Sequence, residues 1–312
     1  MCGPCKMADI SGVFMRFRGQ RNLLETVVLA VTLTLIVVFA ATVDGFATRG
    51  NVSVILSNSA SLAILSCGLA VVIISRGLDL SIIAVMVVGM INAWLFAFAE
   101  LRAMLATLAS AMVVTGLFRF AILRGEFLLL LPKTNPAVQI LTSDLLPGLP
   151  VSTAVMVGAL AATWLLLNRS VAGEIIYAMG DNFLAARLSG LPVRPVTMLI
   201  YVWAALMAMT AGLLISSASG AVDFRTVTNG SLLFDVILVV VLGGIPLRGG
   251  RGGLRNIILG VALIAILRNG MTLMNVTTQV QDVIKGAVLL IAIAVENFLN
   301  PRDIETDTVG DL

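Results

Sequence analysis

Long apolar runs alternate with short polar segments along the whole chain. A helix needs about 20 apolar residues to cross the hydrocarbon core of a bilayer. By that measure the pattern predicts nine membrane-spanning helices, over residues 24–43, 52–74, 80–99, 103–123, 151–167, 196–217, 232–247, 254–273 and 283–299. A further apolar run, 127–131, is too short to cross alone. We therefore expect an all-α polytopic transmembrane bundle of about eight to ten spans.

The composition supports a membrane environment. Of the 312 residues, 59% are apolar and 12% are charged, whereas charged residues make up about 25% of a soluble domain. The chain has no histidine, which excludes Ser-His-Asp and Cys-His catalysis and histidine-ligated metals. Three cysteines form no disulfide framework. These features indicate a membrane protein that is not a self-sufficient enzyme.

Basic residues gather in a few of the polar segments. Lysine and arginine concentrate in the cytoplasmic loops of membrane proteins, so the net charge of +3 indicates topology rather than nucleic-acid binding. The membrane domain is expected over residues 24–299. We assign to the cytoplasm the N-terminal tail 1–23, the loop 168–195, the turn 247–255 and the acidic C-terminal tail 300–312.

Two parts of the chain between these basic segments need separate treatment. Arg76 and the loop 168–195 are both assigned to the cytoplasm, but an odd number of predicted spans separates them. Either one predicted span between Arg76 and Leu131 is re-entrant or a further crossing is hidden there. Segment 132–150 contains four prolines and a single lysine. Because proline stiffens a chain and interrupts helices, we expect an extracytoplasmic loop over these residues.

The clearest local pattern lies in the basic loop 168–195. A glycine-punctuated stretch from Gly173 leads into a short amphipathic helix, in which Leu184 and Leu188 are four residues apart and share one face. Gly190 follows as a helix stop. Such a helix has two interpretations: it lies on the membrane surface, or it docks into a groove on a cytoplasmic partner.

The sequence contains no nucleotide-binding loop of the usual kind. A P-loop requires G-x-x-x-x-G-K-[ST], and none of the three lysines stands in that context. ATP hydrolysis, where it is needed, is therefore expected on another chain. A second glycine-rich segment predicts a tight cytoplasmic turn before a helix that starts at Leu254, and it consists of Gly249, Gly250, Arg251 and Gly252.

Three motifs, in order along the chain, resemble the hallmarks of one family. They are Arg76-Gly77-Leu78-Asp79-Leu80-Ser81, the stretch 173–191, which is similar to G-x-x-I-Y-A-I-G-G-N-x-x-A-A-R-L-S-G-I, and the stretch 243–252. Together they resemble the permease subunits of ribose-type ABC importers, which carry monosaccharides and related small polar solutes. The likeness runs from about residue 50 to residue 296.

The resemblance implies a multi-pass subunit of the bacterial inner membrane that performs no chemistry itself. It implies a second permease copy or paralogue, separate ATPase subunits that use ATP and Mg²⁺, an extracytoplasmic solute-binding protein, and no cofactor on this chain. The residues expected to couple to the ATPase are Gly180, Asp181, Asn182, Phe183, Leu184, Ala185, Ala186, Arg187, Leu188, Ser189 and Gly190.

Two departures from the family pattern are visible. Leu184 stands where the broader importer motif has glutamate, so the charge contact of that glutamate is absent. Ser81 and Asn92 are eleven positions apart, whereas the family has roughly fifty residues, a helix pair, between the corresponding points. About one helix and its connection are therefore expected to be missing within 77–102.

Charged residues in the apolar runs are the remaining clue. An ionised side chain at the bilayer centre costs about 2.5–3.5 kcal/mol, so such residues usually face a cavity or a partner. For Asp235, a role in the solute path and an interhelical hydrogen bond are both open. Lys285, Asp282 and Glu296 are interpreted as interface anchors that reach the headgroups.

Polar but uncharged side chains suit a path for a sugar. Hydroxyl and amide groups offer hydrogen bonds to such a solute without the cost of an ion pair, although they also bind membrane helices to one another. The residues predicted to line the translocation path are Asn58, Ser61, Asp79, Asn92 and Asp235.

Three other functions remain open at this point. The related branched-chain amino-acid permeases share the expected architecture. An ion-coupled secondary transporter would need titratable groups in its core, for which Asp79, Asp235 and Glu296 are the candidates. A structural or regulatory membrane subunit is favoured by the helix that is expected to be missing.

Overall fold

The structure is a computed structural model, and the part of the chain that it describes is mostly helical. It describes residues 10–77, 128–130, 136–146, 149–223 and 231–299, with a few isolated residues between 109 and 120. The helices are α1 (Ile10–Thr42), α2 (Arg49–Ile74), α5 (Pro136–Thr142), α6 (Val151–Arg169), α7 (Val171–Asp181), α8 (Phe183–Leu188), α9 (Val193–Ser219), α11 (Ser231–Leu242), α12 (Leu254–Leu273) and α13 (Thr278–Leu299).

Five helices in the described part are long and apolar enough to cross a membrane. They are Glu25–Thr42, Arg49–Ile74, Val151–Arg169, Val193–Ser219 and Leu254–Leu273. Each coincides with a predicted span, which confirms the prediction of a polytopic helical membrane protein. The predicted spans 80–99 and 103–123 lie outside the described residues, apart from isolated positions.

Two predicted spans differ from the helices that the structure contains. The span predicted at 232–247 is the 12-residue helix α11, about 18 Å long and too short to cross the bilayer. It ends before Gly243, and Gly244 takes a left-handed φ of 89°, which turns the chain out of the helix. Helix α13 begins at Thr278, five residues before the predicted start, because its first turn is polar and does not register as part of an apolar run.

Segment 132–150 contains more regular structure than the loop that the sequence predicts. It holds helix α5 and the strands β2 (Asp144–Leu146) and β3 (Leu149–Pro150), which pair with each other. A second antiparallel pair joins β1 (Leu128–Leu130) to β4 (Ala221–Asp223), which follows α9. Leu141 packs against the buried core, and this apolar contact holds α5 against the bundle.

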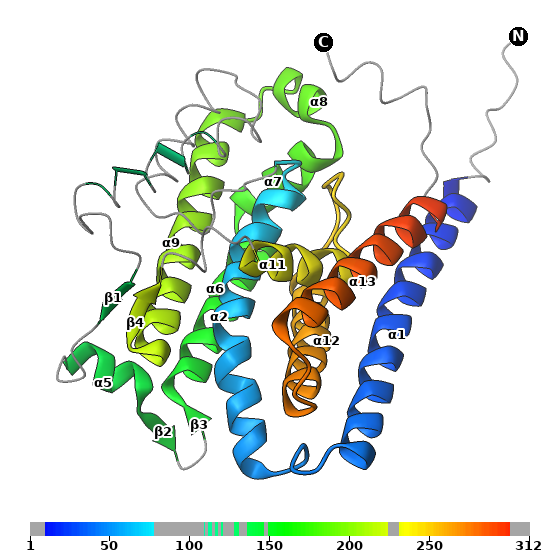
Figure 1. Cartoon of the computed structure of the whole chain (residues 1–312). Helices are drawn as coiled ribbons and strands as arrows, with labels where there is room; N and C mark the ends of the chain where they lie inside the picture. The colour runs from blue at the N-terminus through cyan, green and yellow to red at the C-terminus, as the bar shows by residue number, and fades with distance from the viewer. Residues whose placement is uncertain are drawn as a thin grey trace, which may run out of the picture.

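Helix α2 forms the centre of the bundle. From Ser59 to Ile74 almost every residue of α2 is buried, and α2 contacts α6, α9, α11 and α12. Figure 1 shows α2 between α6 and α9 on one side and α12 on the other. Gly68 allows α9 to approach closely, since a Cβ there would lie 3.1 Å from the Cβ of Met207, an arrangement typical of membrane helices.

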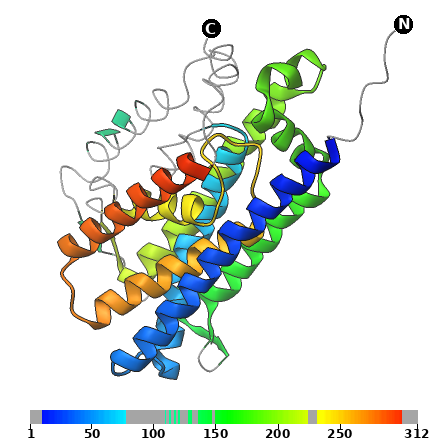
Figure 2. The ribbon, with the colours of Figure 1, turned by 90° about the vertical axis from the view of Figure 1, so that its right-hand side faces the viewer.

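Helix α1 lies on the outside of the bundle. Figure 2 shows it running along one face of the other helices. Its outward residues are large and apolar, and Val37 is 67% exposed and Leu33 is 54% exposed. A contiguous apolar face of this kind is expected to contact lipid. On its inner side, Phe39 contacts Gly270 of α12, where only a glycine leaves room for the ring.

The two ends of the bundle carry different connections. The start of α1, the end of α2, helices α7 and α8 and the turn between α11 and α12 lie at one end in Figure 1, and the α1–α2 and α12–α13 connections lie at the other. The two segments predicted to share a side of the membrane, 168–195 and 247–255, are thus found together. The described helix α1 reaches into the segment predicted as the N-terminal tail.

Candidate functional site

Helix α7 directly precedes the predicted docking segment. Ser170 caps it, since its hydroxyl accepts a hydrogen bond from the Gly173 N–H at 3.1 Å, and Glu174 lies in the first turn, where a carboxylate interacts favourably with the helix dipole. A Cβ at Gly173 would overlap the carbonyl of Leu167, so that glycine permits the sharp bend from α6 into α7. The sequence predicts only a glycine-punctuated stretch here and misses the helix.

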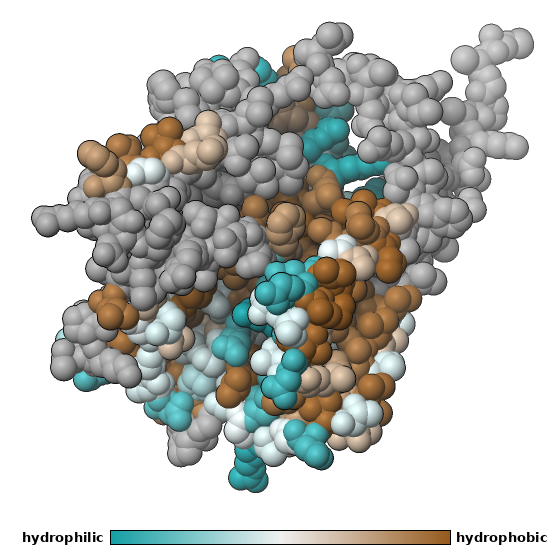
Figure 3. All heavy atoms as spheres, viewed as in Figure 1, coloured by the Kyte–Doolittle hydropathy of each residue, from teal (hydrophilic) through white to brown (hydrophobic). Residues whose placement is uncertain are grey.

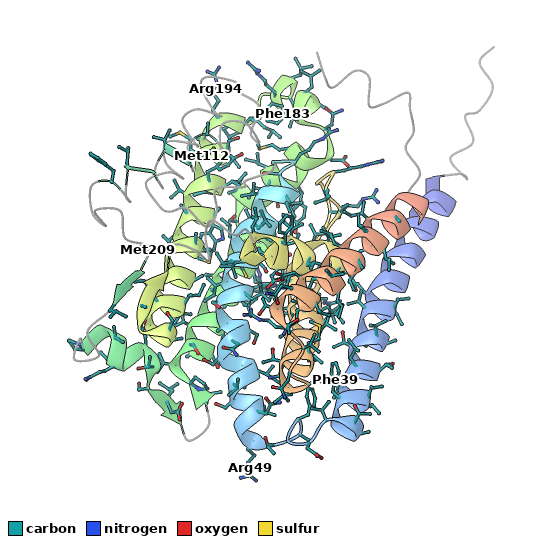
Figure 4. All side chains as sticks on the ribbon, viewed as in Figure 1. Phe39, Arg49, Met112, Phe183, Arg194 and Met209 are labelled. Atoms are coloured by element: carbon teal, nitrogen blue, oxygen red, sulfur yellow. The ribbon has the colours of Figure 1, made fainter. Side chains whose placement is uncertain are left out.

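Helix α8 is the short amphipathic helix that the sequence predicts. The Asn182 side chain caps it by accepting from the Ala185 N–H at 2.9 Å, and Gly190 ends it with a φ of 78°. Ala186 is buried against the body of the protein, whereas Leu184 is 54% and Leu188 is 79% exposed. The two leucines therefore point away from the bundle. Figure 4 shows Phe183 and Arg194 at the same end of the molecule, and Phe183, which is half-buried, packs against the core.

Three distant segments meet directly beneath α8, in what we call the glycine junction: Ile74, Tyr177, Gly180, Gly250 and Gly252. The Gly250 N–H donates a hydrogen bond to the Ile74 carbonyl at 2.8 Å, and a Cβ at Gly180 would overlap both of these groups. The Tyr177 hydroxyl donates to the Gly252 carbonyl at 2.9 Å. The end of α2, helix α7 and the α11–α12 turn are thus joined through main-chain contacts.

The glycine-rich turn that the sequence predicts is confirmed, and so is the helix start at Leu254. Gly249, Gly250 and Gly252 all have positive φ values, of 80°, 74° and 128°, which other residues rarely adopt. Arg251 is exposed between them. All three family-like motifs contribute to one place, because Arg76 follows α2 and a Cβ at Gly249 would contact its main chain.

Helices α11 and α12 form a tight pair behind this turn. The Asn256 side-chain amide donates to the Gly243 carbonyl at 2.6 Å and is buried. A Cβ at Gly260 would overlap the Val239 carbonyl, so the two helices approach at backbone distance. A displacement of the turn is therefore expected to move α11 and α12 together.

The residues predicted to line the translocation path are only partly brought together. Asn58 is exposed on α2, and Ser61, half-buried, lies one turn further along the helix, where its hydroxyl donates to the Asn58 carbonyl at 3.4 Å. Asp79 and Asn92 lie outside the described residues. Asp235 is 3% exposed on α11, and its environment is defined by three other charged residues.

Those three residues and Asp235 form what we call the charge network: Asp235, Arg268, Asp282 and Lys285. The Lys285 Nζ atom lies 2.8 Å from Asp235 Oδ1 and 3.0 Å from Asp282 Oδ1. An Arg268 guanidinium nitrogen lies 3.9 Å from Asp235 Oδ2. The network therefore links α11, α12 and α13. The interhelical hydrogen bond that the sequence left open for Asp235 exists, and its partner is Lys285.

The prediction that Lys285 reaches the headgroups as an interface anchor is wrong. Lys285 is 8% exposed and buried against α11. Because α13 begins at Thr278, Lys285 lies two turns inside the helix, roughly 10 Å from its start. Asp282, in contrast, is half-exposed, and the side chain of Glu296 lies outside the described part of the structure.

A buried ion pair has a clear energetic consequence. Removing two charges from water is costly, and their attraction offsets this cost only with close geometry and further hydrogen bonds. Lys285 satisfies that condition because it bridges two carboxylates. The pairing of Arg268 and Lys285 with Asp235 was not predicted from the sequence, because these partners lie 33 and 50 residues away from Asp235.

Among the described residues, no group of three or more His, Cys, Asp and Glu side chains could hold a metal ion. The arrangement is a membrane-type helical bundle with buried charges between α11 and α13 and a short amphipathic helix, α8, exposed at one end. Residues 88–293 match the family described as branched-chain amino acid transport system / permease component. The chain belongs to this family of ABC transporter permeases, whose members are non-catalytic, multi-pass subunits of the inner membrane.

Several curated proteins are similar over most of their length. The ribose import permease protein RbsC of Bacillus subtilis is 31% identical, with 79% of this chain and 84% of RbsC covered. RbsC of Escherichia coli is 28% identical over 90% and 96%, and the xylose transport system permease protein XylH of Escherichia coli is 27% identical over 90% and 93%. No solved structure matches the chain.

The alignment with one relative contains positions that this chain lacks. The alignment with RbsC of Bacillus subtilis extends over 275 positions but covers only 79% of the 312 residues here. RbsC therefore contains residues that have no counterpart in this chain. The region where the sequence predicts the loss, 77–102, lies outside the described residues except for Gly77.

Proposed function

We propose that this chain is the permease subunit of an ATP-driven importer for a monosaccharide or a similar small polar solute. It forms the translocation path, binds no cofactor itself, and passes on conformational change from a separate ATPase that uses ATP and Mg²⁺. The observation that carries this proposal is α8, a short helix with two exposed leucines fixed to the bundle by the glycine junction.

The charge distribution supports a cytoplasmic position for α8. The end of the bundle that carries α8 holds seven described arginines, in connections, in α8 or in the terminal turns of longer helices: Arg76, Arg169, Arg187, Arg194, Arg248, Arg251 and Arg255. At the other end, Figure 4 places Arg49 at the start of α2. Since basic residues concentrate in cytoplasmic connections, we place α8 inside the cell and the α1–α2 and α12–α13 connections outside.

The geometry supports a path for the mechanical signal. An ATPase that closes on ATP would press against Leu184 and Leu188, which lack cover in the described part of the structure. Because α7 contacts both the end of α2 and the α11–α12 turn through main-chain atoms, these segments would move with it. On the other side of the membrane, a solute-binding protein would deliver the solute, and a second permease copy or paralogue would complete the path.

Sugar is the solute class that we favour. Three sugar permeases are among the similar proteins, and they are named for the import of ribose or the transport of xylose. The polar side chains on α2, Asn58 and Ser61, are uncharged, and they suit a hydroxyl-bearing solute. A branched-chain amino acid is the alternative solute, in keeping with the description of the family.

The test is uptake into proteoliposomes that contain the permease with its ATPase and binding protein. Leu188→Glu places a charge in the proposed contact, and we expect ATP-dependent uptake and stimulated ATP hydrolysis to fall about tenfold or more. Leu188→Met keeps an apolar side chain of similar size and serves as the matched control with near-normal uptake. Unchanged uptake by Leu188→Glu would contradict the coupling role, and uptake driven by an ion gradient without ATP would favour a secondary transporter.

A further inference from the structure

The charge network has a buried half and an exposed half. The side chains of Asp235 and Lys285 are 5% and 10% exposed, whereas those of Arg268 and Asp282 are 51% and 47% exposed. We propose that Arg268 and Asp282 form a binding station for neighbouring hydroxyl groups of a neutral sugar inside the translocation path. This inference rests on the proposed function and adds to it the residues that contact the solute.

The station lies at membrane depth because of the short helix α11. This helix cannot span the bilayer, and Figure 1 shows it between the two ends of the bundle. Asp235 is its fifth residue, and contacts of 2.8 and 3.9 Å tie Lys285 and Arg268 to the same level. Interrupted helices at such depth commonly border the binding sites of transporters, since non-helical backbone is tolerated only beside protein or water.

The exposed half is unsuited to contact with lipid. Ionised side chains inside a membrane usually face a water-filled cavity or a partner rather than hydrocarbon. In the described part of the structure, Arg268 has one charged neighbour, Asp235 at 3.9 Å, and most of its five N–H donors remain available. Asp282 has one carboxylate oxygen on Lys285 at 3.0 Å, which leaves its second oxygen available as an acceptor.

Polar atoms also lie on one face of the bundle. Figure 3 shows hydrophilic and intermediate atoms in a band over α2 and the helices beside it, descending toward the end where Figure 4 labels Arg49. Asn58 and Ser61 are exposed and half-buried residues of α2. Reciprocal hydrogen bonds of 2.9 Å between Asn51 and Asn269 hold α2 beside α12, next to Arg268.

The chemistry of the station suits a neutral polyol. A hydroxyl group both donates and accepts, so two adjacent hydroxyls can accept from a guanidinium and donate to a carboxylate at once. The network contains two carboxylates, one ammonium and one guanidinium, and its formal charge is zero. A zwitterionic amino acid would place its carboxylate on Arg268 and its ammonium on Asp282, so the charges alone do not separate the two solute classes. The choice of a sugar follows from the proposed function, and binding of L-leucine in place of D-ribose in the measurement below would overturn it.

The buried half positions the exposed half. Lys285 bridges Asp235 and Asp282, which fixes the Asp282 carboxylate relative to α11. Asp235 in turn draws the Arg268 guanidinium toward the same point. The two solute-contacting groups are thus oriented by an ion pair that the solute does not need to displace.

The test measures sugar binding to the full-length permease in nanodiscs. Binding is read from the rise in unfolding temperature as D-ribose or 2-deoxy-D-ribose is added up to about 200 mM, a range that detects weak binding. We expect the wild type to bind 2-deoxy-D-ribose about tenfold more weakly than D-ribose, because one hydroxyl contact is lost. In Arg268→Gln and Asp282→Asn, D-ribose should bind about tenfold more weakly and the preference for ribose should shrink. Arg169→Gln, an exposed arginine at the α8 end, is the matched control and should retain both.

The outcomes separate this inference from the proposed function. Equal binding of the two sugars by the wild type, or an unchanged ribose preference in both variants, overturns the station. Loss of the second permease copy in Arg268→Gln, with unaltered sugar binding, would make this edge an interface between copies and would also overturn it. Selective binding without any ATP-dependent uptake would contradict the importer function and leave the station standing, whereas Leu188→Glu should abolish uptake and leave sugar binding unchanged.

Discussion

The glycine junction and the charge network both join helices that are distant in the sequence, but they do so with different atoms. At the junction, α2, α7 and the α11–α12 turn meet through main-chain groups, and Gly180 has no side chain that could move aside. In the network, α11, α12 and α13 meet through long side chains, two of which are half-exposed. Main-chain contacts favour movement as one body, whereas charged side chains can exchange partners.

This difference fits two separate functions along the axis of the bundle, coupling to the ATPase at the α8 end and solute binding at the centre. Under the proposed function, the end that carries α8 needs a stiff connection, since a force on Leu188 has to reach the spanning helices. Under the same proposal, the centre needs groups that can bind a solute and release it, and half-exposed charges have that property. The following variants test whether the two regions differ in this way.

The largest effect is expected for Lys285→Met in the charge network. The substitution leaves Asp235 buried without its 2.8 Å partner, and breaking a buried ion pair from one side costs about 3–5 kcal/mol of unfolding free energy. The measurement is the denaturation midpoint of the purified permease in detergent. In the double variant Lys285→Met/Asp235→Leu no buried charge remains at this site, because the remaining Arg268 and Asp282 are half-exposed, and most of the stability should return; a single variant as stable as the wild type would contradict the pairing.

The glycine junction is tested by Gly180→Ala. A Cβ would overlap main-chain atoms of Ile74 and Gly250, which cannot rotate away, and such overpacking costs about 1–3 kcal/mol. Gly158→Ala in α6 is the matched control, because no atom lies within 4 Å of its added Cβ and alanine stabilises a helix relative to glycine. If both variants had the same denaturation midpoint, the junction would not be close-packed.

The parts of the site that depend on local sequence could be predicted, and those that depend on distant contacts could not. The spacing of Leu184 and Leu188 and the stop at Gly190 identify α8 without any tertiary information. The two glycines of α7, Gly173 and Gly180, argue against a helix by their low propensity. Only the close approach of the Leu167 and Ile74 carbonyls explains why glycine is needed there.

The same limit applies to the membrane-embedded charges. Apolar runs predict five of the spanning helices at nearly the observed positions, because hydropathy reflects the solvent directly. The role of Lys285 follows instead from a helix start in polar residues at Thr278 and from a partner 50 residues away. Neither is encoded in a local pattern, and a single sequence contains no record of which distant residues come together.

The central claim is that α8 contacts the ATPase, and site-directed crosslinking tests it most directly. In a background without the native cysteines (Cys2→Ser, Cys5→Ser, Cys67→Ala), a single cysteine is introduced as Leu188→Cys, or as Val37→Cys on the apolar face of α1. Both positions are strongly exposed, at 79% and 67%, so neither substitution is expected to disturb folding. In the assembled importer, Leu188→Cys should crosslink to the ATPase in a nucleotide-dependent manner and Val37→Cys should not. No adduct at Leu188→Cys, or equal adducts at both positions, would contradict the account.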